Sequence, residues 1–136
     1  MDVFFYGLFM DESILLKNGV DPVNPRTGYL EHYALNIGER ASLIPSDGER
    51  SYGILMTVDP AAIRDLYAEP SVADYIPEEV LVTLENNEQV QAICYNLPAE
   101  ALKGTNSKYA RALYELASKR GFPEDYLEKI LMYVKE

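Results

Sequence analysis

Most of the strand-like segments in this sequence are joined by short turns rather than by crossover helices. Runs of β-branched and aromatic residues, typical of strands, lie at residues 3–6, 29–37, 52–58, 79–84 and 89–97. The pair Asn86-Asn87 is typical of a hairpin turn between the last two runs. Because parallel neighbours need long crossovers, this order favours an α+β fold whose largely antiparallel or mixed sheet curls into a small barrel flanked by helices.

Amphipathic spacing and capping residues predict four helices. They lie at residues 12–17, 61–67, 107–120 and 123–134. Asp11 and Asp59 are suitable N-caps for the first two helices, because an Asp side chain accepts hydrogen bonds from the first free backbone N–H groups. Gly121 is a suitable C-cap between the last two.

Turn-forming residues mark the expected loops. Residues 20–27 contain Asp-Pro and Asn-Pro steps and are expected to form a loop, as is the polar segment 68–77. Pro45-Ser46-Asp47-Gly48 is expected to break the chain into short pieces before residue 52. No repeat, low-complexity tract or linker divides the sequence, so residues 1–136 are expected to form a single domain.

Charge and composition exclude several classes of partner. The formal charge of −10 repels both a nucleic-acid backbone and an anionic membrane surface. No run approaches the length of a membrane span, and no basic-then-apolar signal segment opens the sequence. We therefore expect a cytoplasmic protein without nucleic-acid or membrane partners. These features predict neither a particular substrate nor the oligomeric state.

The sequence offers little for metal, thiol or cofactor chemistry. Its single histidine, His32, and single cysteine, Cys94, cannot form a Cys/His metal cluster, and one cysteine cannot form an intrachain disulfide. Cys94 lies in an apolar strand-like run, where an inert core thiol is expected. Phosphate-loop, dinucleotide and Gly-x-Ser-x-Gly motifs are not found. We therefore expect no metal and no cofactor, which leaves carboxylate chemistry.

Among the 22 acidic residues, Glu69 is distinguished by its position. It follows a short helix directly after a strand whose near-continuous apolar run predicts burial on both faces. A carboxylate partly enclosed at that point would have a raised pKa and would exchange a proton near neutral pH. Glu69 is therefore the candidate general acid/base.

The first strand leads into a second candidate feature. Gly7 ends the run Val3–Tyr6, and Asp11 then caps a helix. A strand, a glycine turn and a capped helix direct free backbone N–H groups toward one point, which suits a carboxylate or an oxyanion.

Several motifs together resemble the γ-glutamylcyclotransferase-like superfamily over nearly the whole chain. These motifs are the opening strand with Tyr6-Gly7-Leu8-Phe9, the strand beginning Tyr52-Gly53, the segment Ile63 to Glu69 with Tyr75 beyond it, Ser107-Lys108-Tyr109, and Gly121-Phe122-Pro123-Glu124-Asp125-Tyr126. The resemblance implies a mixed-sheet barrel with a site at its mouth. It also implies a reaction in which the α-amine of a γ-glutamyl group attacks its own γ-carbonyl, forming 5-oxoproline and releasing an amine or amino acid.

The same resemblance implies roles for individual residues. Glu69 would be the general acid/base, and backbone N–H groups of the glycine turn would hold the substrate carboxylate or the oxyanion. The tyrosines would line the pocket and donate hydroxyl hydrogen bonds. The implied substrate-binding residues are Tyr6, Gly7, Leu8, Phe9, Tyr75 and Tyr109.

The chain departs from the superfamily pattern at two places. Leu8 stands where a Ser or Thr is usual, and Leu66-Tyr67-Ala68-Glu69-Pro70 is one residue shorter than Leu-Asp-x-x-Glu and lacks the aspartate. Asp74 or Glu78 is therefore an alternative to Glu69. Two other functions stay open: a non-catalytic small-molecule binding or regulatory domain on the same fold, and a hydrolase in which Glu69 activates water.

Overall fold

The computed structural model describes residues 1–134, and within them five strands form a closed barrel. The strands are β1 (Asp2–Phe5), β2 (Val23–Ile37), β3 (Ala41–Thr57), β4 (Ile76–Leu84) and β5 (Gln89–Asn96). Their order around the barrel is β1-β3-β2-β4-β5. All neighbours pair antiparallel except β1 and β5, which pair in parallel. The predicted α+β fold with a mixed-sheet barrel is confirmed.

The four predicted helices are present, together with two short 3-10 helices. The helices are α1 (Glu12–Lys17), α2 (Pro60–Leu66), α3 (Ser107–Lys119) and α4 (Glu124–Leu131), and the 3-10 helices are η1 (Leu8–Met10) and η2 (Ala99–Ala101). The expected N-caps form, since Asp11 accepts from the N–H of Ser13 and Asp59 from that of Ala61. The C-cap of α3 is Arg120, and the expected Gly121 follows it with a φ of 76°. The last helix ends at Leu131 rather than at Val134 as predicted.

The β2–β3 hairpin is longer than the sequence predicts. Residues 23–27 belong to β2 instead of a loop, and Pro45-Ser46-Asp47-Gly48 lies inside β3 instead of breaking it. Irregularities in the ladder accommodate these residues. The register shifts between Val23 and Arg26 and again between Glu31 and Tyr33, and a bulge of this kind absorbs a residue that regular pairing would exclude.

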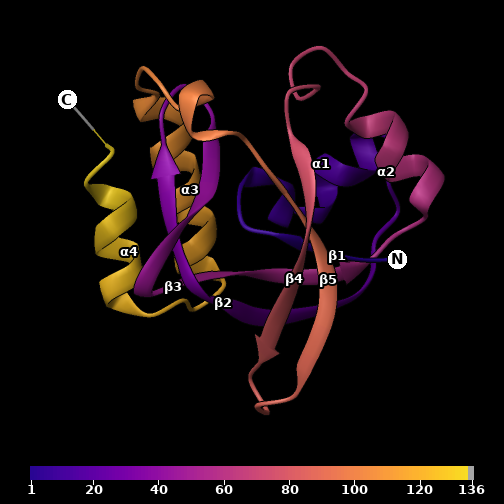
Figure 1. The fold of residues 1–136 in the computed structure, drawn as a ribbon, viewed down its shortest axis with the longest axis horizontal. Helices are drawn as coiled ribbons and strands as arrows, with labels where there is room; N and C mark the ends of the chain where they lie inside the picture. The colour runs from indigo at the N-terminus through magenta and orange to yellow at the C-terminus, as the bar shows by residue number, and fades with distance from the viewer. Residues whose placement is uncertain (135–136) are drawn as a thin grey trace.

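The helices lie in two groups on either side of the strands (Figure 1). α3 and α4 lie together beside the outer part of the β2–β3 hairpin, and α1 and α2 lie on the opposite side of the view. On the first side, the ring of Tyr52 packs against that of Tyr126 with centroids 5.2 Å apart. The apolar residues of β3 from Ile54 to Met56 are buried, as predicted for a strand covered on both faces.

One glycine sets the distance between β1 and β3. A Cβ atom on Gly53 would meet the backbone oxygen of Phe5 and, at 2.7 Å, the ring of Phe4. The strand pair at the base of the barrel therefore requires glycine at this position.

None of the helices within residues 1–134 combines the length and apolarity needed to cross a bilayer.

Candidate functional site

A cavity of about 280 Å³ lies at the end of the barrel where β1 gives way to η1. Residues 4–9 form one wall, and residues 39–41 at the start of β3 form another. The loop after α2 contributes Tyr67, Ser71, Val72 and Tyr75, and the remaining lining residues are Ile14, Tyr95 and Tyr109. Five tyrosine side chains thus surround a mainly apolar space.

The turn at Gly7, between β1 and η1, forms the floor of the cavity. Gly7 precedes η1, and the phenolic oxygen of Tyr109 accepts a hydrogen bond of 3.2 Å from the N–H of Leu8. A Cβ atom on Gly7 would collide with that same oxygen. Gly7 is therefore needed for close approach rather than for its φ of −109°, which other residues adopt readily.

Two of the lining tyrosines donate their hydroxyl protons to the backbone. Tyr6 donates to the carbonyl of Tyr95 at 2.7 Å, and Tyr75 donates to that of Ala41 at 2.7 Å. These two hydrogen bonds connect the segments that form the walls of the cavity. In the hydrogen bond between Leu8 and Tyr109 the hydroxyl oxygen of Tyr109 is the acceptor. The hydroxyl proton of Tyr109 is therefore not used in this hydrogen bond.

Burial keeps these phenols protonated. It raises the pKa of Tyr6 and Tyr67 well above the usual value, and it raises that of Tyr75 to about 12 against the opposing charge of Arg40. The pKa of Tyr109 is also raised by burial. The cavity therefore offers neutral hydroxyl groups, not phenolate bases, at neutral pH.

The six residues predicted to bind substrate all line this cavity, whereas Glu69 does not. Glu69 lies on the turn between the lining residues Tyr67 and Ser71, and its side chain is exposed. Its carbonyl accepts a hydrogen bond of 3.0 Å from the N–H of Val72, which fixes the turn. In this conformation the Glu69 carboxylate is outside the space that a ligand would fill.

The alternative carboxylates also lie outside the lining. Asp74 pairs with Arg40 at 3.3 Å, and Glu78 accepts hydrogen bonds from Asn96 at 3.2 Å and from Tyr33 at 3.4 Å. Of the acidic residues among 1–134, only Glu39 belongs to the cavity lining; it is exposed, and its side chain lies beside Gly104.

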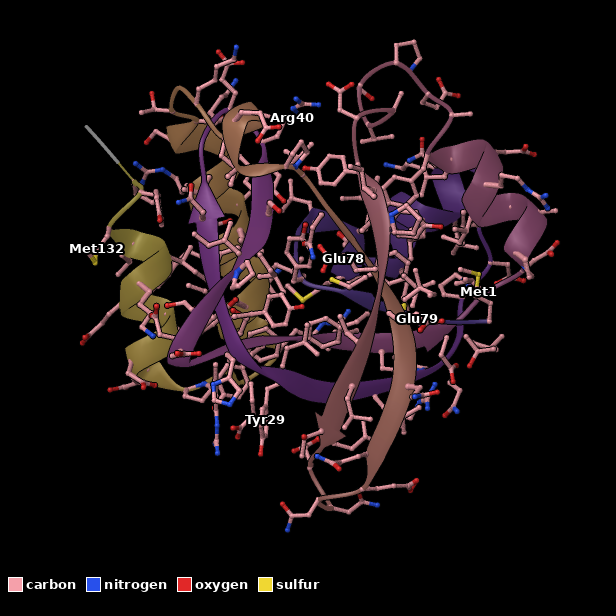
Figure 2. All side chains as sticks on the ribbon, viewed as in Figure 1. Met1, Tyr29, Arg40, Glu78, Glu79 and Met132 are labelled. Carbon is pink, nitrogen blue, oxygen red and sulfur yellow. The ribbon has the colours of Figure 1, made fainter. Side chains whose placement is uncertain are left out.

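Sequence analysis missed Glu39, Arg40, Tyr67 and Tyr95 as lining residues. Glu39 and Arg40 lie in the tight connection between β2 and β3, and Arg40 reaches toward the loop before β4 (Figure 2). The only available signal was a charged pair following Gly38 at a turn, which many surface turns share. Tyr67 and Tyr95 stack with centroids 3.9 Å apart and planes 8° from parallel, a contact between segments distant in sequence.

The described part of the chain contains no group of three His, Cys, Asp or Glu side chains placed to hold a metal ion. Cys94 is fully buried, and burial raises the pKa of its thiol. His32 lies on β2 and does not line the cavity.

The chain is similar in sequence to one protein family and in fold to several solved structures. The AIG2-like family model matches residues 50–130. A solved gamma-glutamyl cyclotransferase is 18% identical with a TM-score of 0.79, over 100% of this chain and 89% of that one. A yeast gamma-glutamyl cyclotransferase specific to glutathione is 13% identical with a TM-score of 0.67, over 98% and 95%.

An AIG2-like protein from Mus musculus is 20% identical with a TM-score of 0.58, over 79% of this chain and 88% of that one. Identities this low show a shared fold. No curated protein sequence matches the chain significantly.

Proposed function

This chain belongs to the AIG2-like family, within the γ-glutamylcyclotransferase-like superfamily that its motifs resemble, and from that premise we propose that it closes a γ-glutamyl group to 5-oxoproline in the barrel-end cavity. The observation that carries the proposal is the convergence of the Tyr6–Phe9 turn, Tyr75 and Tyr109 on one cavity. Its volume of about 280 Å³ suits a small molecule.

The reaction needs positioning more than it needs a cofactor. The α-amine forms a bond to the γ-carbonyl carbon, the original amide C–N bond breaks, and two protons pass from the α-ammonium to the leaving amine, which departs as an ammonium ion. Because attack is intramolecular, a cavity that folds the substrate into an attacking geometry supplies much of the acceleration. Because the N–H of Leu8 already donates to Tyr109, the N–H groups of Gly7 and Phe9 are the ones suited to the oxyanion.

The reaction also needs a group that carries the protons. Glu69 is the proposed general acid/base, and this role requires its exposed carboxylate to turn from solvent into the cavity. Glu39 already lines the cavity and is the alternative carrier. The exposure of Glu69 favours a second candidate function, the binding of a γ-glutamyl compound without turnover.

An assay for 5-oxoproline after incubation with several γ-glutamyl compounds tests these possibilities, with calorimetry as a separate measure of binding. We expect lactam formation, reduced about 100-fold or more in Glu69→Gln because a positioned general acid/base contributes that much. Glu85→Gln, at an exposed position after β4, is the charge-matched control and should retain the parent rate.

The other outcomes separate the alternatives. Loss of turnover in Glu39→Gln alone would move the proton carrier to Glu39. Binding without any lactam would overturn the enzymatic proposal in favour of a binding domain. Release of free glutamate instead of 5-oxoproline would indicate a hydrolase.

A further inference from the structure

Arg40 is the one cationic side chain lining the cavity among the described residues. It lies at the edge of the cavity, between the β2–β3 connection and the loop before β4 (Figure 2), and its side chain is 33% exposed. At this position the guanidinium group is partly exposed to solvent and adjoins Tyr75, another lining residue.

The backbone beneath Arg40 is held in place by a distant segment. The N–H of Glu39 donates to the carbonyl of Lys103 at 2.9 Å, and Asn106 Nδ2 donates to the carbonyl of Glu39 at 3.1 Å. The N–H of Gly38 donates to the carbonyl of Arg40 at 3.0 Å. This connection is therefore set before any ligand arrives, which lowers the entropy lost on binding.

The guanidinium group has one weak ionic partner. Arg40 Nη2 lies 3.3 Å from Asp74 Oδ2, and the Asp74 side chain is 67% exposed. The Tyr75 ring centroid lies 5.9 Å from the guanidinium carbon and supports it from one face. An exposed pair of this kind contributes little, so a ligand carboxylate can replace Asp74 or share the guanidinium with it.

The charge of the whole chain gives this single cation its significance. At −10, the protein repels an anionic small molecule in general. The guanidinium of Arg40, which stands beside the carboxylates of Glu39 and Asp74, is the positive group available to such a molecule at the cavity, and its planar fork matches the geometry of a carboxylate.

We propose that Arg40 binds a carboxylate of the γ-glutamyl substrate. This inference rests on the proposed function, because a γ-glutamyl amino acid carries two carboxylates, one on the glutamyl group and one on the leaving amino acid. Either of them can be the partner of Arg40.

Calorimetry with three matched ligands distinguishes the two sources. γ-Glutamylalanine has both carboxylates, γ-glutamylethylamide lacks the leaving one, and 4-aminobutanoylalanine lacks the glutamyl one. We expect Arg40→Gln to weaken γ-glutamylalanine binding about tenfold, as expected for one lost charge-assisted hydrogen bond. If the affinity of one truncated ligand is the same for the parent and for Arg40→Gln, the carboxylate that this ligand lacks is the partner of Arg40.

Three further variants complete the test. Arg111→Gln removes the same charge from an exposed position outside the cavity and should bind like the parent. Arg40→Lys should recover part of the affinity, and Asp74→Asn should increase it by freeing the guanidinium. Thermal unfolding of each variant reports whether it is folded.

An equal response of all three ligands to Arg40→Gln, or no response, would overturn the inference. Arg40-dependent binding without 5-oxoproline production would leave the inference standing and remove the proposed function. If Arg40→Gln forms the lactam at the parent rate, the proposed function stands and the role of Arg40 is removed. If the folded parent binds none of the ligands, both the proposed function and the role of Arg40 are overturned.

Discussion

The backbone N–H of Leu8 donates a hydrogen bond of 3.2 Å to the phenolic oxygen of Tyr109. This bond joins the turn after β1 to the first turn of α3, across 101 positions of sequence. The same oxygen occupies the space that a side chain on Gly7 would need. The floor of the cavity therefore depends on a matched pair, glycine on one side and a hydroxyl on the other.

Gly7→Ala and Tyr109→Phe should destabilise the protein separately and compensate in combination. The first change introduces a collision that we expect to cost about 1–3 kcal/mol, and the second removes the acceptor of the Leu8 N–H at a cost of about 1 kcal/mol. In the double variant the nearest remaining ring carbon would lie 3.7 Å from the new Cβ, an ordinary contact. Urea unfolding should therefore show a double variant more stable than the sum of single effects predicts.

Gly19→Ala combined with Tyr109→Phe is the control cycle. Gly19 has nothing within 4 Å of an added Cβ, although its φ of +83° makes alanine unfavourable. Its effect should add to that of Tyr109→Phe. Additivity in the Gly7 cycle as well would contradict the steric explanation.

The barrel can be predicted from the sequence because the order of apolar and polar residues in each strand shows which of its faces are buried. Residues 54–56 are apolar on both faces and lie buried on both. The extent of β2 and β3 was beyond local reasoning. Asn24 adopts a positive φ of 54° and His32 one of 67°, so both lie at irregularities where pairing continues in spite of turn-forming residues. Only the partner strand determines that outcome.

In the site as well, some lining residues can be predicted from their neighbours in the sequence, and others depend on contacts with distant segments. Tyr6 and Gly7 follow a recognisable strand and turn, and they line the cavity as predicted. Arg40 lines it because Lys103 and Asn106 hold the β2–β3 connection, a contact that no local pattern encodes. For Glu69 the sequence predicts the turn, but side-chain direction follows from the backbone of that turn. Its catalytic role stays a prediction.

Tyr75→Phe should change the alkaline stability of the protein. Below about pH 10 the tyrosine is protonated in both states, and between about 10 and about 12 the unfolded chain loses this proton while the folded chain keeps it. The unfolded state then binds fewer protons, so the free energy of unfolding falls as pH rises through this window.

At neutral pH the variant should be less stable by about 1 kcal/mol, because it loses the hydrogen bond from Tyr75 to Ala41. The difference between parent and variant should narrow above pH 10 and reverse in sign before pH 12, because the rise in pKa from 10.0 to about 12 outweighs the hydrogen bond. Tyr114→Phe, in α3 outside the cavity lining, is the matched control. Parallel stability curves for Tyr75→Phe and the parent would count against the shifted ionisation.

Asn96 holds the start of β3 against the end of β5, and its removal should destabilise the barrel. Asn96 is 2% exposed, and its Oδ1 accepts a hydrogen bond of 3.1 Å from the N–H of Leu43. Asn96→Ala leaves that buried N–H without its partner, at an expected cost of about 1–3 kcal/mol in urea unfolding. Gln91→Ala, at an exposed position of the same strand, should change stability by no more than about 0.5 kcal/mol.

Asn96→Asp tests which part of the amide matters. It keeps an oxygen for Leu43 but replaces the Nδ2 group that now donates to Glu78 at 3.2 Å with a second acceptor. Two carboxylates then face each other, so we expect a larger loss than for Asn96→Ala at neutral pH and a partial recovery as acid protonates one of them. A loss independent of pH would contradict the expected repulsion between the two carboxylates.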